Sequence, residues 1–242
     1  MSITVGTYNI QHGVLHRHRL ATGETKVDLC DVCEVLGTYR PAICALNEIY
    51  GDEAGIFGNQ PRQMAETLGY PYHAFARGIY HKFGEYGNAL LSRYPIRDAR
   101  TIPLSIPTKA RKGTQMYEDR ALLIATLDVE GKEVVAMVCH FGLNDDEQAL
   151  AVDTILAEAA RITVPILLMG DFNLTPDTAH YRRLAAAFTD TARGAASPTF
   201  PSEAPQIKID YVFTKGCLTV AEALTPAAVA SDHLPIFTTL KL

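Results

Sequence analysis

The chain has 242 residues, 48% of them hydrophobic and 20% charged, which is typical of a globular protein and too apolar for a disordered one. Its 22 basic and 27 acidic residues give a formal net charge of −5, which disfavours binding to duplex nucleic acid through many phosphates. A basic groove within that total stays an open alternative. The odd number of cysteines, five, excludes a disulfide scaffold in a chain of this length.

The start of the chain lacks a basic stretch followed by a long apolar core, and no apolar run reaches the roughly 18 residues of a membrane helix. We therefore expect a soluble, cytoplasmic protein that does not insert into membranes. The acidic charge balance makes a monomer the default expectation.

The first part of the chain predicts, in order, a strand, a polar loop, a helix, a buried strand, a loop and a helix. Their residues are 3–8, 11–25, 29–36, 42–46, 51–58 and 61–68. Pro41 must end the first helix, and Gly69 follows the second as a C-terminal cap. Within the loop, a solvated role is favoured over substrate contact both for His12 and for the basic run at 16–19.

Strands dominate the second part of the chain. Expected strands are residues 72–77, 89–92, 121–129, 133–139, 164–170, 207–213 and 234–240. Residues 130–132 form a tight turn of a hairpin, and Asn144 with Glu147 predicts a capped helix to about Arg161. A further helix is expected at 179–188. With no linker or repeat, we expect one α/β domain over residues 1–242, with layered sheets and outer helices.

Cysteine placement gives weak signals. Cys44, Cys139 and Cys217 lie in apolar runs, where buried free thiols are expected. Cys30 and Cys33 form a lone CxxC without a second pair or a histidine pair at zinc spacing, so a structural role is favoured over zinc or redox chemistry.

Polar residues lie at or near the ends of the predicted strands, where a sheet can bring side chains together at one edge. Each alone is explained as a cap or turn residue, but together four carboxylates would repel one another unless a cation or proton shared the site. Oxygen ligands favour Mg²⁺ or Mn²⁺ over zinc. The group comprises Asn9, Glu48, His140, Asp171, Asn173, Asp210, Asp232 and His233.

Eight segments in this order resemble the endonuclease/exonuclease/phosphatase superfamily, the fold of DNase I-like nucleases and inositol polyphosphate phosphatases. The resemblance covers roughly residues 3 to 240 and implies a four-layer αββα sandwich, in which helices flank two mixed, mainly antiparallel sheets. The segments are TYNIQHG (7–13), ALNEIYG (45–51), GNALLSRYPI (87–96), DRALL (119–123), VCHFGLN (138–144), MGDFNLTP (169–176), IKIDYVF (207–213) and SDHLPI (231–236).

The resemblance also implies a metal site. Glu48 matches the metal-binding glutamate of the family, Asn9 matches the asparagine beside it, and Asp232 matches a further carboxylate near the metal. A hard cation there, Mg²⁺ or Mn²⁺, would polarise a phosphoryl oxygen and stabilise the charge of the transition state.

The remaining matches imply roles in hydrolysis. Asp171 matches the residue that orients or deprotonates the attacking water, and Asn173 would donate to a phosphoryl oxygen. His233 matches a histidine that pairs with a carboxylate, here Asp210. The two further matches are His140, a phosphate contact or acid, and Arg120, a bidentate phosphate contact.

Some positions depart from the family pattern. Asn47 stands where glutamine is usual, and Gln11 stands where some apurinic endonucleases carry aspartate, which weakens that activity. Asn88 suits a structural turn as well as a substrate contact. The chain lacks tryptophan, a basic insertion and the inositol phosphatase motif.

The sequence therefore predicts a metal-dependent phosphoesterase acting on a small phosphodiester or phosphomonoester. A nuclease acting on nucleic acid is the second hypothesis. A non-catalytic relative that binds a phosphorylated ligand is the third, and it is disfavoured because every central residue is present.

Overall fold

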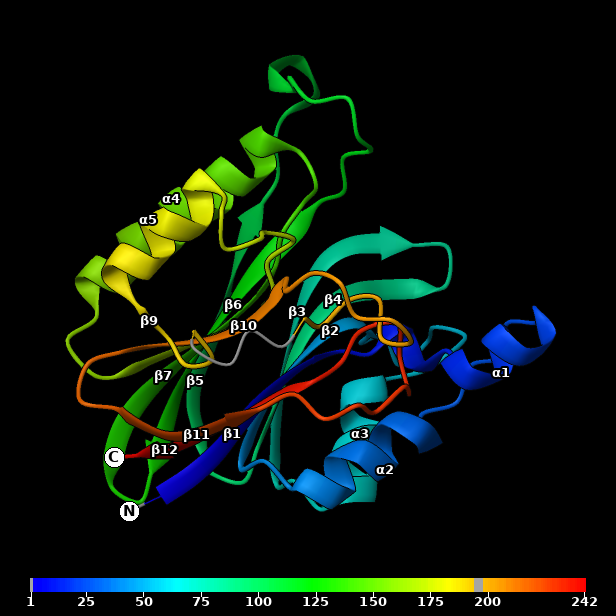
Figure 1. Ribbon diagram of the computed structural model, residues 1–242, viewed down its shortest axis with the longest axis horizontal. Helices are drawn as coiled ribbons and strands as arrows, with labels where there is room; N and C mark the ends of the chain where they lie inside the picture. Colours follow the sequence, from blue (N-terminus) through cyan, green and yellow to red (C-terminus); the bar gives the residue numbers. More distant parts are fainter. Residues whose placement is uncertain (1, 194–197) are drawn as a thin grey trace.

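Two six-stranded sheets pack face to face in the computed structural model, which describes residues 2–193 and 198–242 (Figure 1). The first sheet has the order β11-β12-β1-β2-β4-β3 and the second has the order β5-β6-β7-β8-β10-β9. The strands of the first sheet are β1 (Ser2–Asn9), β2 (Ile43–Tyr50), β3 (Tyr72–His81), β4 (Gly84–Ser92), β11 (Thr219–Leu224) and β12 (Ile236–Lys241). Those of the second are β5 (Ile96–Leu104), β6 (Arg120–Val129), β7 (Lys132–His140), β8 (Ile166–Asp171), β9 (Thr189–Asp190) and β10 (Asp210–Lys215).

Helices cover the outer faces of both sheets. Helices α2 and α3 lie against the first sheet, and α4 and α5 lie against the second (Figure 1). The five α-helices of the described residues are α1 (His16–Thr22), α2 (Cys30–Tyr39), α3 (Gln60–Leu68), α4 (Asp145–Arg161) and α5 (Ala179–Ala187). No helix in this part of the chain has the length and apolar character needed to cross a membrane. The layered fold expected from the sequence is thus confirmed.

Burial on both faces explains why the central strands are apolar throughout. In β6 to β8, Leu123, Val138 and Met169 enter the core between the two sheets. Their neighbours alternate to the opposite face, where Leu122 and Leu168 pack under α4 and α5. A strand covered on both sides has no solvent face and therefore reads as a continuous apolar run.

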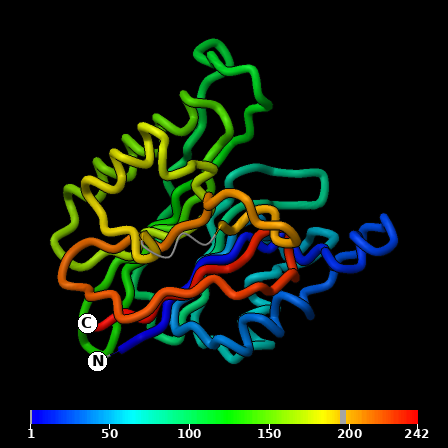
Figure 2. Tube along the Cα trace, in the orientation of Figure 1, coloured from blue at the N-terminus to red at the C-terminus, as the bar shows by residue number. Residues whose placement is uncertain are grey.

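Each sheet has one parallel pair at its centre. Strand β1 runs parallel to β2, and β7 runs parallel to β8, whereas the other pairs in the described residues are antiparallel. Strand β1 also pairs with β12, so the two ends of the chain run side by side (Figure 2). The carboxyl ends of the parallel strands place their last residues at one edge of the sandwich.

Several predictions about local structure are wrong, and the strands expected at 72–77 and 89–92 extend over 72–81 and 84–92. Residues 11–25 were expected as a loop but contain α1, which Gly23 ends in the left-handed conformation at φ 76°. The strand expected at 42–46 continues to Tyr50, and the one expected at 207–213 begins only at Asp210. Cys217, expected to be buried, is exposed in the turn before β11.

The strands β5 and β11 have no counterpart in the sequence prediction. Both are edge strands with largely exposed side chains, so they lack the apolar alternation that marks a half-buried strand. Cys30 and Cys33 lie in the first turn of α2, the former exposed and the latter buried, and both are free thiols.

Candidate active site

Three strands of the second sheet place polar side chains at one level. His140 on β7 and Asp210 on β10 are the register partners of Asp171 at the end of β8. All three side chains are buried. Gly170 permits this arrangement, because at φ 147° a side chain there would collide with the Cys139 carbonyl of β7.

Three asparagines lie at one register level of the first sheet, opposite these residues, and the middle one bonds to the second sheet. Asn9 on β1 and Asn88 on β4 are the register partners of Asn47 on β2. The Asn47 amide nitrogen donates to Asn88 Oδ1 at 2.8 Å and to the Cys139 carbonyl at 2.9 Å, and Asn47 Oδ1 accepts from the Asp171 backbone N–H at 2.9 Å. Asn47 thus fixes the strand end that carries Asp171. Asn88 donates in turn to the Ala121 carbonyl, which gives it a structural role.

Asp171 is the centre of the site. Its Oδ2 accepts from Asn9 Nδ2 at 3.1 Å, and it lies 3.4 Å from His140 Nε2 and 3.7 Å from His233 Nε2. Its Oδ1 accepts from the Asn173 backbone N–H at 2.9 Å. Burial and the charge of Asp210 raise the pKa of Asp171 above that of an exposed carboxyl group, against the lowering effect of His233.

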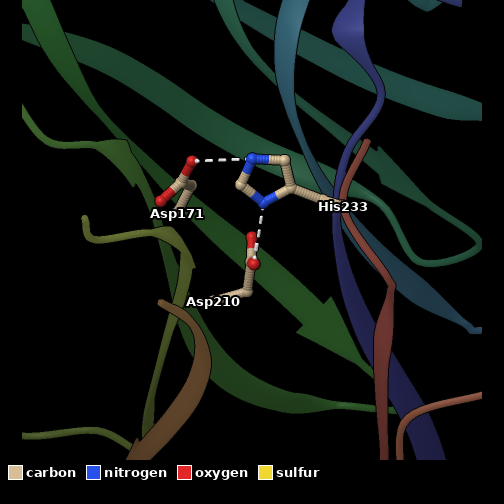
Figure 3. A group of neighbouring side chains, drawn as sticks. All are labelled: Asp171, Asp210 and His233. Atoms are coloured by element: carbon tan, nitrogen blue, oxygen red, sulfur yellow. Dashed lines mark hydrogen bonds and ion pairs between the residues drawn. The ribbon is translucent and has the colours of Figure 1, made fainter. Parts of the chain in front are cut away.

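His233 lies between two carboxylates (Figure 3). Its Nδ1 is 2.9 Å from Asp210 Oδ2, on the opposite side of the ring from Asp171. Burial alone would lower the pKa of His233, but the charges of Asp210 and Asp171 outweigh it and raise the pKa to about 10. The ring is therefore an imidazolium at neutral pH.

The same three residues have the spacing of a metal cluster, since their ligand atoms lie within 4.8 Å of one another. Each ring nitrogen of His233 already lies near a carboxylate oxygen, at 2.9 Å for Asp210 and 3.7 Å for Asp171. We therefore interpret Asp171, His233 and Asp210 as an ion-paired triad rather than a metal site.

His140 has the opposite character. Arg120 Nη1 donates to His140 Nδ1 at 2.9 Å, so the ring proton is assigned to Nε2, which faces Asp171. Burial, together with the charges of Arg120 and His233, holds the pKa of His140 well below its ordinary value. His140 is therefore neutral, whereas His233 is charged.

Glu48 is aimed at the cleft by a β-bulge. The register of β2 on β4 shifts between Asn47 and Ile49, and Glu48 adopts the left-handed conformation at φ 57°. Its Oε1 accepts from Asn9 Nδ2 at 3.0 Å and its Oε2 accepts from the Tyr86 hydroxyl at 2.9 Å. Both Glu48 oxygens are thereby oriented.

Asp232 lies across the same cleft, where its Oδ2 accepts from Gln11 Nε2 at 2.7 Å. Burial raises the pKa of Asp232, and the charge of Glu48 raises it further. Glu48 and Asp232 are thus two carboxylates that face one half-buried cleft, and they form a donor set that fits a hard divalent cation. Asn9 directs its amide nitrogen at Glu48 and Asp171 and its oxygen at the Gln11 backbone, so it orients both carboxylates as a donor.

All of the site residues predicted from the sequence, except the fully buried Asn9 and Asp210, line a cleft of about 460 Å³. Asn173 is on its wall and donates its amide to the Phe141 carbonyl at 3.0 Å. Arg120 is there too, with Nη2 at 3.3 Å from Glu118 Oε2 and a buried Nε that has no partner among the described residues. The structure thus brings the predicted site residues together in and around one cleft.

Three positioning residues were missed from the sequence: Asn47, Tyr86 and Gln11. The sequence indicated Asn47 and Gln11 only as departures from the family pattern, and no sequence feature indicated a role for Tyr86. Their roles depend on contacts between the two sheets or between distant loops, which periodicity within one strand does not reveal.

The endonuclease/exonuclease/phosphatase family model matches residues 6–233. The chain belongs to this family. Members are generally phosphoester hydrolases, typically dependent on a divalent metal.

Similar proteins agree with this assignment. The uncharacterized protein YbhP of Escherichia coli K12 is 26% identical over 183 residues, which cover 72% of this chain and 69% of YbhP. An endonuclease/exonuclease/phosphatase from Beutenbergia cavernae aligns with a TM-score of 0.81 at 24% identity, over 100% of this chain and 72% of its own. The Bacteroides thetaiotaomicron mannosyl-6-phosphatase Bt3783 aligns with a TM-score of 0.76 at 16% identity, over 99% and 100%. The two structural likenesses show the shared fold.

Proposed function

We propose that this protein is a Mg²⁺- or Mn²⁺-dependent phosphoesterase that hydrolyses a P–O bond of a small phosphodiester or phosphomonoester. The observation that carries the proposal is the charged pair at the mouth of the cleft, where a buried carboxylate, Asp171, faces the imidazolium of His233 at 3.7 Å. A proton acceptor and a cationic donor side by side are what attack of water on a phosphate ester requires.

The residues act together in an in-line attack. Asp171 orients the water and accepts its proton, for which its raised pKa suits it. His233, kept charged by Asp210, donates to a phosphoryl oxygen, and Asn173 donates to another. When bound by Glu48 and Asp232, the divalent cation supplies Lewis-acid polarisation of the phosphoryl oxygen.

Two further groups serve the phosphate. Arg120 lines the cleft with its Nη1 held by His140 and its Nη2 near Glu118, and we assign its guanidinium to the phosphoryl group as a charge-assisted donor. His140 carries its proton on Nε2 within the same cleft and holds Asp171 in place. Because the ring is neutral, it donates a hydrogen bond without adding a second positive charge beside His233.

The net charge of −5 supports a small substrate over a polynucleotide. A similar fold in a mannosyl-6-phosphatase is compatible with a small phosphate ester. The same proposal includes a cytoplasmic location, a monomeric state and a phosphorylated small molecule as the partner.

The test is hydrolysis of a panel with Mg²⁺ or Mn²⁺, with and without EDTA. The panel contains supercoiled plasmid, a single-stranded oligonucleotide, p-nitrophenyl phosphate, bis-p-nitrophenyl phosphate, inositol phosphates and sugar phosphates. Cleavage of small esters that EDTA abolishes supports the proposal. Nicking of plasmid at low protein concentration would replace it by the nuclease, and metal-loaded protein inactive on the whole panel would contradict it.

Asp171→Asn should lower kcat by several orders of magnitude while the far-UV circular dichroism spectrum stays unchanged. Asp98→Asn is the matched control, because Asp98 is an exposed carboxylate on the edge strand β5. Equal turnover by the two variants would remove Asp171 from the role of water activation.

A further inference from the structure

A second hollow adjoins the phosphate cleft. It has a volume of about 390 Å³ and shares Glu48 and Arg120 with the cleft. A group bound in it is therefore next to a phosphate held by Arg120. We call it the aromatic pocket, and it is lined by His12, Glu48, Tyr50, Ile79, His81, Tyr86, Met116, Tyr117, Glu118 and Arg120.

The rings of the aromatic pocket form a cluster of inclined planes. Tyr50 lies 4.8 Å from Tyr86 at 50° and 5.4 Å from His12 at 81°, measured between ring centroids. His81 lies 6.2 Å from Tyr86 at 40°. These inclined pairs form no parallel slot for a flat base, and rings set at several angles suit a rounded group instead.

The hydroxyl groups of the aromatic pocket are committed to other partners. The Tyr50 hydroxyl is 3.1 Å from His81 Nδ1, and the Tyr86 hydroxyl donates to Glu48 at 2.9 Å. The Tyr117 hydroxyl donates to Asp146 at 2.7 Å. A polyhydroxylated group such as a sugar would find few free partners on these walls.

The aromatic pocket contains two carboxylates, that of Glu48, which is assigned to the metal, and that of Glu118. Its side chain is 25% exposed, its Oε2 pairs with Arg120 at 3.3 Å, and among the described residues it accepts no other hydrogen bond. Glu118 and Tyr50 line the same pocket, so the carboxylate of Glu118 faces the space that the rings enclose. Burial lowers the pKa of His12, which leaves that ring neutral.

We propose that the aromatic pocket binds one substituent of the substrate phosphorus, and that this substituent carries a substituted ammonium ion. This inference rests on the proposed function. Aromatic faces and a nearby carboxylate are the groups that recognise such a cation. The Arg120–Glu118 pair, guanidinium beside carboxylate, complements a phosphate ester that carries an ammonium group a few bonds away.

The test compares two esters that differ in charge alone. The first carries choline and the second carries 3,3-dimethylbutanol, which has the same shape with carbon in place of nitrogen. Each is supplied as its p-nitrophenyl phosphodiester and as its phosphomonoester. Wild-type protein with Mg²⁺ should favour the choline ester roughly tenfold in kcat/KM, mainly through a lower KM.

Glu118→Gln should reduce that preference to about twofold, because the amide keeps the shape and loses the charge. Glu133→Gln, an exposed carboxylate at the start of β7, should leave the preference intact. Comparing the two esters within each variant cancels any effect of the substitution on how Arg120 holds the phosphate.

The outcomes separate the two proposals. Equal kcat/KM for the charged and neutral esters in wild-type protein would overturn the aromatic-pocket inference and leave the hydrolase intact. A preference that survives Glu118→Gln would likewise overturn it. No hydrolysis of either matched pair, of p-nitrophenyl phosphate or of bis-p-nitrophenyl phosphate would contradict the proposed function itself.

Discussion

Replacing Asn47 by leucine should destabilise the protein strongly. The substitution removes three hydrogen bonds in a fully buried position and leaves Asn88 Oδ1 without a partner, whereas the Cys139 carbonyl and the Asp171 N–H keep their places in the β7–β8 ladder. A hydrogen bond contributes roughly 0.5–1.5 kcal/mol and an orphaned buried group costs roughly 1–3 kcal/mol, so the loss should be about 2–5 kcal/mol. That is a large part of the about 5–15 kcal/mol that stabilises a typical domain.

Urea denaturation in EDTA, followed by far-UV circular dichroism, measures this loss without any contribution from bound metal. The single variant Asn88→Ala and the double variant complete a thermodynamic cycle, and the coupling energy should be about 0.5 kcal/mol or more. A destabilisation of Asn47→Leu below about 1 kcal/mol would refute the reasoning that this amide joins the sheets.

Three further predictions concern charges. Glu48→Gln should weaken Mg²⁺ binding at least tenfold in a calorimetric titration, and an unchanged titration would exclude Glu48 as a ligand. The pKa of His233 is raised to about 10 from its ordinary value of 6.5, so the stability that its charged ring contributes through Asp210 is complete below pH 6.5 and is lost as the pH rises towards 10. Melting temperatures in EDTA should fall across that window, and Asp210→Asn should flatten the fall; equal slopes would contradict the pairing. Lys208→Met leaves the buried Asp190 carboxylate without its cation, which Nζ holds at 2.9 and 3.0 Å, and should cost roughly 3–5 kcal/mol in urea denaturation; a loss below about 1 kcal/mol would count against it.

The predictable parts of the fold are those with strong local patterns. The central strands are apolar throughout because both faces are buried, and α4 begins at a capping box of Asn144 and Glu147, as its sequence indicates. The short helix α1 was missed because its sequence, HRHRLAT, has no apolar stripe. Tertiary contacts hold this helix in place, such as the one between the buried His16 Nε2 and Glu203 Oε2 at 3.2 Å.

The site was predictable where its residues end strands. His140 and Asp171 follow apolar runs, and their register on neighbouring strands brings them to one level. Sequence reasoning did not reach the bulge that turns Glu48, since a left-handed glutamate in mid-strand has no local signal. It also took His12 for a loop residue, although contacts with Tyr50 and Tyr86 place it on the wall of the aromatic pocket.

The pairing of β1 with β12 has a consequence for synthesis of the chain on the ribosome. Strand β2 emerges soon after β1 and covers one of its edges, but the other edge stays open until β12 has been translated. His233 comes just before β12, so until then the carboxylates of Asp171 and Asp210 have no imidazolium between them. A nascent chain thus carries an unpaired strand edge for nearly the whole of its translation and an incomplete charge triad from Asp210 until His233, and both are completed by the same final segment.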